Sequence, residues 1–232
     1  MPVISFANSK GGSGKTTSAL VLACELAQQR SVTIVDADPR HPIARWAGLP
    51  GKPDNLTVIV NETEESIVDQ IDAAASNDPF VIVDLEGIGS RRVTYAIGLS
   101  DLVIIPMKEQ QQDALAALDI IREIANAGKV SRPRREIPFS VLFTQSRVIA
   151  KPRTARHIAD QFRHEGRIDT FNTELHDRDA FAAIYTTGGT VRDLKPSDVN
   201  NTDKAVENAA TYAAEVIDRL RSLSGDTSRE VA

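Results

Sequence analysis

Ser9-Lys10-Gly11-Gly12-Ser13-Gly14-Lys15-Thr16-Thr17 is the stretch that decides the fold. It lies between an apolar, strand-like run at residues 3–7 and an Ala- and Leu-rich segment at residues 18–29. Glycines let the backbone curl so that successive N–H groups point inward, and the helix that follows directs its positive end to the same place. The stretch therefore predicts a phosphate-binding loop between a strand and a helix.

Two side chains of this loop have a chemical role that follows from their position. Lys15 would place a full positive charge over the β- and γ-phosphates of a nucleotide. Thr16 would direct its hydroxyl to Mg²⁺. The residues expected to contact the nucleotide are Gly11, Gly12, Ser13, Gly14, Lys15, Thr16 and Thr17.

The loop departs from the standard Walker A pattern, which has glycine five residues before Gly14, where this chain has Ser9. A second lysine stands at Lys10. With it, residues 10–17 resemble the deviant Walker A motif of the ParA/MinD family of P-loop ATPases. The resemblance implies ATP and Mg²⁺ as cofactors and a homodimer that forms around bound ATP. In such a dimer Lys10 reaches the phosphates held by the partner subunit, as an arginine finger does, while Lys15 acts in its own subunit.

Two acidic motifs follow the loop at the ends of expected strands. Residues 32–35 lead into Asp36 and Asp38, and the resemblance implies that Asp38 orients the attacking water while Asp36 lies near the Mg²⁺. Another interpretation is that these two acids cap the following helix. The family usually has Gln at the next position but one, where this chain has Arg40, so a role for that side chain stays open.

The third acidic position has the form of a Walker B strand. The apolar residues 80–83 end in Asp84, which would hold Mg²⁺ through water. Glu86 adds a carboxylate without an assigned role. The expected metal site is Thr16, Asp36 and Asp84, and the expected catalytic residues are Lys10, Lys15 and Asp38.

The remaining pattern indicates an α/β fold. Continuously apolar runs at residues 3–7, 32–35, 80–85 and 102–106, with weaker ones at 56–60 and 139–143, are typical of strands covered on both faces. Helical periodicity separates them, at residues 67–75 and 115–125 among others. We therefore predict a doubly wound, mainly parallel sheet flanked by helices on both faces. It forms one domain over residues 1–223, which ends in an amphipathic helix from residue 205. A flexible polar tail is expected at residues 224–232.

Resemblance to small ParF-type partition ATPases extends over most of residues 1–125 and more weakly to about residue 190. Of their proline-rich segment only Asp113 matches here. Thr144 and Gln145, at the end of the expected strand, are in position to meet the base. Residues 178–181 resemble a segment near the dimer surface of VirC-type and ParA-type relatives, although a simple helix start explains them equally well.

Charge is distributed unevenly along the chain. The 232 residues carry a net charge of −5, which argues against binding nucleic acid through overall charge. Residues 129–167, however, hold ten basic and three acidic side chains, a net +7, so the rest of the chain carries −12. A helix over residues 154–163 would gather arginines near one face, which predicts sequence-independent DNA binding. The alternative is a solvated helix face whose charges pair with acidic side chains elsewhere in the chain. The candidate DNA-binding residues are Lys151, Arg153, Arg156 and Arg163.

Together these features indicate a ParA-type partition switch. We expect an ATP-bound dimer on non-specific DNA, released when a ParB- or ParG-like centromere-binding partner stimulates hydrolysis, in a cytoplasmic, nucleoid-associated protein. A MinD-like membrane switch and an ATPase that positions another cargo are the alternatives. The segment at residues 217–223 lacks the character of a basic amphipathic anchor, and apolar runs are far shorter than the ~20 residues that span a bilayer. Cys24, the single cysteine, is expected in the core and leaves no partner for a disulfide within the chain.

Overall fold

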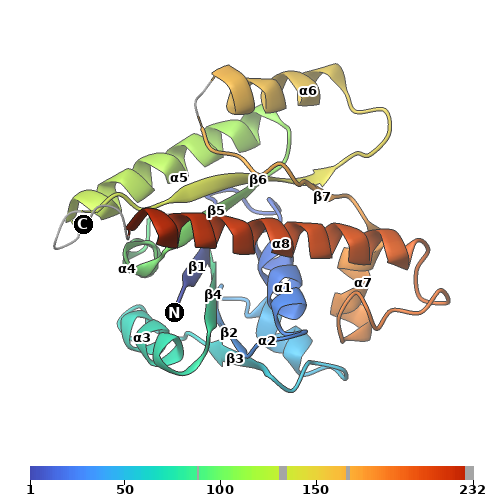
Figure 1. Ribbon diagram of the computed structural model, residues 1–232, viewed down its shortest axis with the longest axis horizontal. Helices are drawn as coiled ribbons and strands as arrows, with labels where there is room; N and C mark the ends of the chain where they lie inside the picture. The colour runs from blue at the N-terminus through green and yellow to red at the C-terminus, as the bar shows by residue number, and fades with distance from the viewer. Residues whose placement is uncertain (88, 131–134, 166–167, 228–232) are drawn as a thin grey trace.

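The computed structural model describes residues 1–87, 89–130, 135–165 and 168–227. Within them a seven-stranded parallel sheet has the order β3-β2-β4-β1-β5-β6-β7 (Figure 1). The predicted fold class is confirmed. The strands are β1 Val3–Phe6, β2 Val32–Ala37, β3 Leu56–Val60, β4 Phe80–Leu85, β5 Leu102–Met107, β6 Phe139–Ser146 and β7 Leu175–His176.

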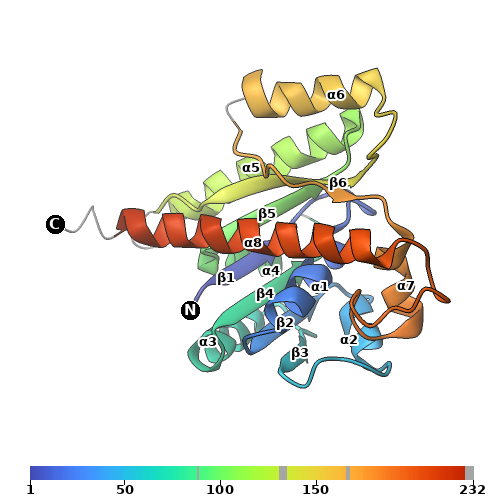
Figure 2. The ribbon, with the colours of Figure 1, turned by 45° about the vertical axis from the view of Figure 1, so that its right-hand side comes forward.

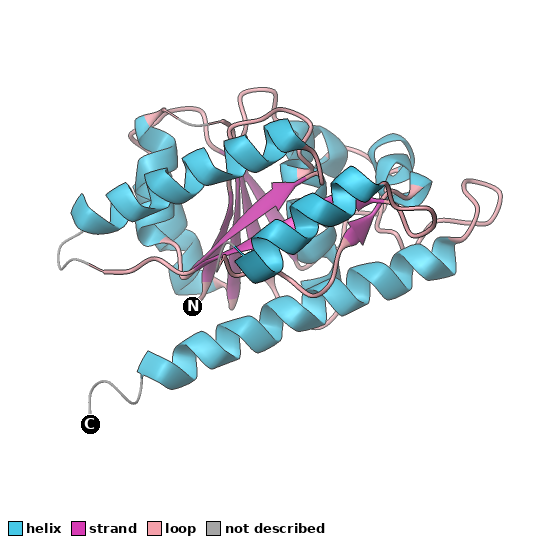
Figure 3. Ribbon diagram, turned by 90° about the horizontal axis from the view of Figure 1, so that it is seen from above, coloured by secondary structure: helices cyan, strands magenta, loops and turns pink. Residues whose placement is uncertain are grey.

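Helices cover both faces of the sheet, as continuously apolar strands require. One core lies under α1 (Lys15–Leu26), α2 (Pro42–Ala47), α7 (Asp179–Thr187) and α8 (Thr202–Thr227). The other lies under α3 (Ile67–Asn77), α4 (Arg91–Leu99), α5 (Gln111–Val130) and α6 (Arg153–Asp160). Seen from above, the long C-terminal helix lies along one side of the molecule (Figure 3).

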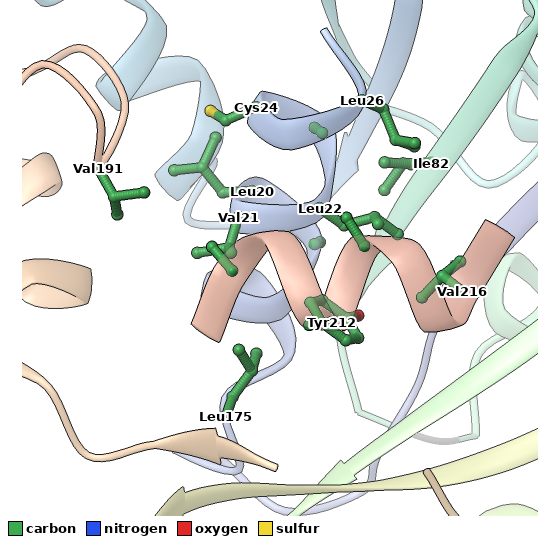
Figure 4. Close-up of a cluster of buried hydrophobic side chains, with 14 of the residues drawn as sticks. Leu20, Val21, Leu22, Cys24, Leu26, Ile82, Leu175, Val191, Tyr212 and Val216 are labelled. Atoms are coloured by element: carbon green, nitrogen blue, oxygen red, sulfur yellow. The ribbon is translucent and has the colours of Figure 1, made fainter. Parts of the chain in front are cut away.

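The last helix, α8, packs across α1 and closes the first core (Figure 2). Tyr212 and Val216 are fully buried and face side chains of α1 (Figure 4). Cys24, also on α1, lies in the same core, as predicted. Burial raises the pKa of the Cys24 thiol to about 12, with Glu25 and Asp193 adding to the rise. The thiol is therefore a packing group in its neutral form.

Several element boundaries differ from the sequence prediction. The terminal helix continues through Thr227 instead of ending at Leu223, because the helical hydrogen-bond pattern persists and the Ser224 hydroxyl donates to the carbonyl of Leu220 at 2.9 Å. The helix expected at residues 154–163 consists of α6 followed by a π-helical turn, Gln161–Glu165. The sequence pattern predicts neither α4 nor β7, and it indicates α2 only as the helix that the two acids would cap. None of the described helices is long and apolar enough to cross a membrane.

Candidate functional site

The predicted phosphate loop connects β1 to α1 at the carboxyl edge of the sheet, where parallel α/β sheets bind ligands. Its path is fixed by Asn8, which is fully buried. The Asn8 side chain donates to the carbonyl of Pro106 at 2.7 Å and accepts the backbone N–H of Lys10 at 2.9 Å. One amide side chain thus ties the start of the loop to the end of β5.

Backbone conformation explains two of the loop glycines. Gly12 has φ 72° and Gly14 has φ 93°. Both values lie in the left-handed region, which is energetically unfavourable for any residue that has a Cβ atom. At Gly14 a Cβ would also lie 3.1 Å from the side chain of Thr144. Glycine is required there for both reasons.

Thr144 and Gln145, predicted to meet a base, contact the loop itself. The Thr144 hydroxyl donates to the carbonyl of Ser13 at 2.6 Å, and the Gln145 amide donates to the carbonyl of Gly12 at 3.3 Å. These bonds tie two loop carbonyls to the end of β6. The end of β6 therefore braces the loop, a role that the sequence did not indicate.

A cavity of about 460 Å³ opens in front of the loop. It brings together residues from the ends of β1, β2 and β4, which lie side by side because Asp36 and Asp84 are paired in the sheet register. Among the described lining residues, Lys15 and Arg40 carry the positive charges and Asp38 and Glu86 the negative ones. The other lining residues are Ser9, Gly11, Gly12, Ser13, Gly14, Thr16, Thr17, Pro39, Gly87 and Gln145.

Lys15 lines this cavity, and the buried Asp84 lies close enough to influence its charge. Burial lowers the pKa of Lys15, while the nearby Asp84 and Asp38 oppose the decrease. Burial raises the pKa of Asp84 to about 7, and the Thr16 side chain and Lys15 counteract the rise. Both Asp84 oxygens are buried without a well-formed hydrogen bond among the described residues. Such a carboxylate lacks a ligand that would stabilise its charge.

Asp36 has a structural function as well. Its Oδ2 accepts the backbone N–H groups of Ile43 at 3.0 Å and Ala44 at 2.9 Å, in the first turn of α2. The interpretation as a helix-capping acid therefore holds for this oxygen. Its Oδ1 is buried without a hydrogen-bond partner among the described residues. Burial raises the pKa of Asp36, although the bonds from Ala44 and Ile43 oppose this.

Lys10, expected to act on a partner subunit, turns back onto its own chain. Its ammonium group forms an ion pair with Asp113, which lies in the first turn of α5 and is fully buried. Lys10 is not among the residues that line the cavity. In the single subunit the loop cavity thus has Lys15 but not Lys10.

A second cavity of similar size adjoins the loop on the side of β7. Thr17, Thr144 and Gln145 contribute to its wall, together with residues from the β7–α7 connection. The sequence did not indicate this wall, because a two-residue strand leaves no periodic pattern. Residues on this side are Leu175, His176, Asp177, Arg178, Phe181, Ala182 and Tyr185. Residues 178–181 begin α7, with Asp179 in its first turn.

The four candidate DNA-binding side chains fall into two pairs. Arg153 and Arg156 are exposed on α6. Lys151 forms ion pairs with Glu109 and Glu174, and Arg163 forms one with Glu174 at 3.0 Å. The expectation that Arg163 shares an open face with Arg153 and Arg156 is therefore not met, since its guanidinium packs over Phe143 at 5.1 Å. Arg132, Arg134 and Arg167 of the basic segment lie outside the described residues.

The family described as VirC1 protein matches residues 1–227. Protein ParA of Rhizobium radiobacter is 35% identical over 221 residues, covering 95% of this chain and 98% of that protein. The maintenance of carboxysome distribution protein A of Halothiobacillus neapolitanus is 29% identical over 130 residues, 55% of this chain and 60% of that protein.

Among solved structures, the septum site-determining protein MinD of Pyrococcus horikoshii, complexed with Mg-ADP, superposes with a TM-score of 0.69 at 13% identity. The superposition covers 93% of this chain and 95% of MinD. The superposition supports the fold. The family match over residues 1–227 supports the relationship that the glycine loop and its second lysine indicated. The chain belongs to the VirC1 family and has the fold of the ParA/MinD P-loop ATPases.

Proposed function

We propose that this protein is a Mg²⁺-dependent ATPase that acts as a partition switch. The observation that carries the proposal is the cavity lined by a glycine loop and the buried Lys15, with the buried Asp84 close to Lys15. Loop N–H groups and the amino end of α1 favour a polyphosphate there. The second cavity, beside Thr144 and Gln145, would receive the base and ribose.

The residues present fit Mg²⁺. Both oxygens of Asp84 and one of Asp36 are buried without a hydrogen-bond partner among the described residues, and the Thr16 side chain approaches Asp84. Oxygen ligands of this kind, joined by phosphate oxygens and water, suit Mg²⁺. Bound there, the ion would neutralise negative charge on the β- and γ-phosphates. Thr16 and Asp84 would hold it, with Asp36 in support.

The chain's own groups would then divide the remaining tasks. Lys15 would stabilise the negative charge on the transferred phosphoryl group, because its ammonium group is already desolvated and faces that space. Asp38 lines the cavity and is only partly buried, so it can orient an attacking water at the open side. Its Oδ1 is held by the backbone N–H of Arg40 at 2.8 Å, which fixes its orientation.

Dimerisation would require a change at Lys10. For Lys10 to reach phosphates in a partner subunit, its ion pair with Asp113 must open. ATP shared between two subunits would give the Lys10 ammonium group a new negative partner, whereas loss of the γ-phosphate would remove that partner. We therefore expect a dimer with ATP and a monomer with ADP.

The DNA-binding part of the proposal depends on α6. Arg153 and Arg156 are exposed and have no ion pair among the described residues, so they can contact phosphates without reading bases. A centromere-binding partner of the ParB or ParG kind would then release the dimer by stimulating hydrolysis. Cargo would be plasmid or chromosomal DNA.

A DNA-binding titration in four states tests this function: without nucleotide, with ADP, with ATP and with a slowly hydrolysed ATP analogue. We expect tight binding only with ATP and its analogue. Arg153→Glu and Arg156→Glu should weaken that binding while leaving ATP hydrolysis intact. Arg45→Glu, on the exposed side of α2, is the matched control and should bind as the parent does. Equal DNA binding in all four states would refute the switch.

Positioning of another cargo is the second candidate, favoured by the similarity to the carboxysome distribution protein of Halothiobacillus neapolitanus. It shares the ATP chemistry and differs in what the dimer carries. Imaging the labelled protein beside a labelled plasmid of its host distinguishes the two. Segregation of the plasmid should fail in Lys15→Ala cells if DNA is the cargo, and should continue if it is not.

A further inference from the structure

We infer that Arg40 is a phosphate-binding residue of its own subunit, a second cation that recognises the terminal phosphate of ATP. The inference rests on the proposed function, since it concerns the same cavity. The motif that this stretch resembles usually has Gln at this position, so the resemblance assigns no such role to the side chain.

The backbone fixes where Arg40 starts. Asp38, Pro39, Arg40 and His41 form a tight turn, closed by the bond from the His41 N–H to the Asp38 carbonyl at 2.8 Å. Proline at the second position suits such a turn. The Arg40 N–H donates to the side chain of Asp38 at 2.8 Å, so the turn is bonded through both backbone and side chain.

The next residues anchor the far side of the turn. His41 has φ 45°, a left-handed conformation that is uncommon for a residue with a side chain. It leads into α2, whose first turn is held by Asp36 through Ile43 and Ala44. The buried carboxylate of Asp36 and the partly buried carboxylate of Asp38 thus fix the turn that places Arg40 on the wall of the cavity.

The Arg40 side chain is free to use this position. It is exposed, and its guanidinium makes neither a hydrogen bond nor an ion pair with any residue that the structure describes. Arg92, Arg163 and Arg219, in contrast, bond to carbonyls or carboxylates. An arginine on a cavity wall without a protein partner is available for a ligand.

Charge balance in the cavity indicates what that ligand is. Asp38 and Glu86 also line it, and Lys15 is the other cation among the described lining residues. Lys15 faces Asp84 and Asp38, while Lys10 is paired with Asp113. A triphosphate therefore meets more negative than positive side chains unless Arg40 takes part. A planar guanidinium binds two phosphate oxygens at once, which suits a terminal phosphate.

The test compares ATP with ADP. Affinities of both are measured with Mg²⁺ present, by fluorescence of a labelled analogue displaced by the unlabelled nucleotide, for the parent, Arg40→Gln, Arg40→Lys and Arg45→Gln. A lost charge-assisted bond predicts about a tenfold weaker ATP affinity in Arg40→Gln and little change for ADP. Arg40→Lys should recover part of the loss. Arg45→Gln removes the same charge from α2 outside the cavity and should resemble the parent.

Glu86→Gln separates ligand binding from an ion pair between Arg40 and Glu86. If Arg40 binds phosphate, removing the Glu86 charge should strengthen ATP binding. A loss that matches Arg40→Gln would overturn the inference, because Arg40 would then act through Glu86. Equal loss for ATP and ADP, or no loss, would overturn it too. A parent that binds neither nucleotide would refute the proposed function itself.

Discussion

At the scale of single residues, the contact between Lys10 and Asp113 links the phosphate loop to α5. The Asp113 side chain is fully buried and that of Lys10 is 31% exposed. A buried carboxylate is stable only when its charge is compensated. In the nucleotide-free chain Lys10 supplies this compensation, so the same lysine stabilises the monomer and is expected to act in the dimer.

The pair should therefore show energetic coupling in nucleotide-free protein. Lys10→Ala leaves Asp113 unpaired and should destabilise the chain more than Asp113→Asn does. In a double-mutant cycle read by urea unfolding, we expect a coupling energy of about 1 kcal/mol or more. The exposed pair Lys204 and Glu207 on α8 is the control, with coupling near zero. Additive effects at Lys10 and Asp113 would show that the contact does not stabilise the monomer.

At the scale of elements, the loops after α2 and α7 approach each other closely. The Trp46 indole donates to the carbonyl of Gly189 at 3.0 Å, which joins α2 to the loop after α7. Gly188 has φ 79°, and a Cβ there would lie 2.3 Å from the carbonyl oxygen of Pro50. Backbone has to shift before any side chain fits at this position.

Gly188→Ala should thus destabilise the protein strongly, by about 2 kcal/mol or more, from backbone strain and steric overlap together. Gly98→Ala is the matched control, because Gly98 lies inside α4 with nothing within 4 Å of a built Cβ. That change should be neutral or stabilise by up to ~1 kcal/mol. Thermal unfolding of both variants measures the contrast, and equal melting temperatures would contradict the close approach.

The attachment of α8 to the segment before β7 depends on Glu215. Its two carboxylate oxygens accept the backbone N–H groups of Asn172 and Thr173, each at 2.8 Å, and Arg219 lies 3.1 Å away. Burial alone would raise the pKa of Glu215, but these bonds outweigh it and lower the pKa. The ionised form is therefore favoured by folding.

A carboxyl group whose pKa is lower in the folded state stabilises the protein at pH values above the ordinary pKa of the group, here 4.5. This contribution is lost as the pH falls from there through the folded value. Glu215→Gln should cost about 1–2 kcal/mol at pH 7, and the difference from the parent should shrink below pH 4.5. Glu207→Gln, exposed on the same helix, should show a much weaker effect. Urea unfolding at a series of pH values measures it, and a constant difference across the series would be incompatible with this linkage.

How well the sequence predicted each element depended on how local its determinants are. Strands β3 and β4 match the predicted runs at both ends, since their strand-forming residues are consecutive in the sequence. In contrast α2 is six residues long and is stabilised by Asp36 from β2, a contact that periodicity does not reveal. The strand β7 has two residues and forms only because β6 offers it an edge.

The site shows the same division. The loop glycines and Lys15 line one cavity and Asp84 lies near Lys15, because the motif and the parallel sheet bring them to one edge. The pairing of Lys10 with Asp113 joins residues 103 positions apart, so no local pattern indicates it. The same holds for the ion pairs of Lys151 and Arg163, which distinguish these two side chains from the exposed Arg153 and Arg156.

At the scale of the whole molecule, the net charge of −5 conceals a strong asymmetry. The segment that contains β6 and α6 is basic, and α6 lies on the outside of the fold, over the β5–β6 side of the sheet (Figure 1). Part of its charge is neutralised internally, by Glu109 and Glu174 on Lys151 and Arg163. The proposed DNA binding should therefore depend on few residues, among them Arg153 and Arg156, which are exposed on α6.

The salt dependence of DNA binding measures how many phosphates those residues contact. The logarithm of the affinity should fall linearly with the logarithm of salt concentration, with a slope of about −0.9 per phosphate contacted. Arg153→Glu with Arg156→Glu should make the slope shallower by about 2, besides weakening binding. The control, Lys204→Glu with Arg221→Glu, changes the net charge equally on α8 and should leave the slope unchanged. Should both pairs of substitutions flatten the slope alike, the chain would bind through its overall charge, and α6 would not be the DNA-binding face.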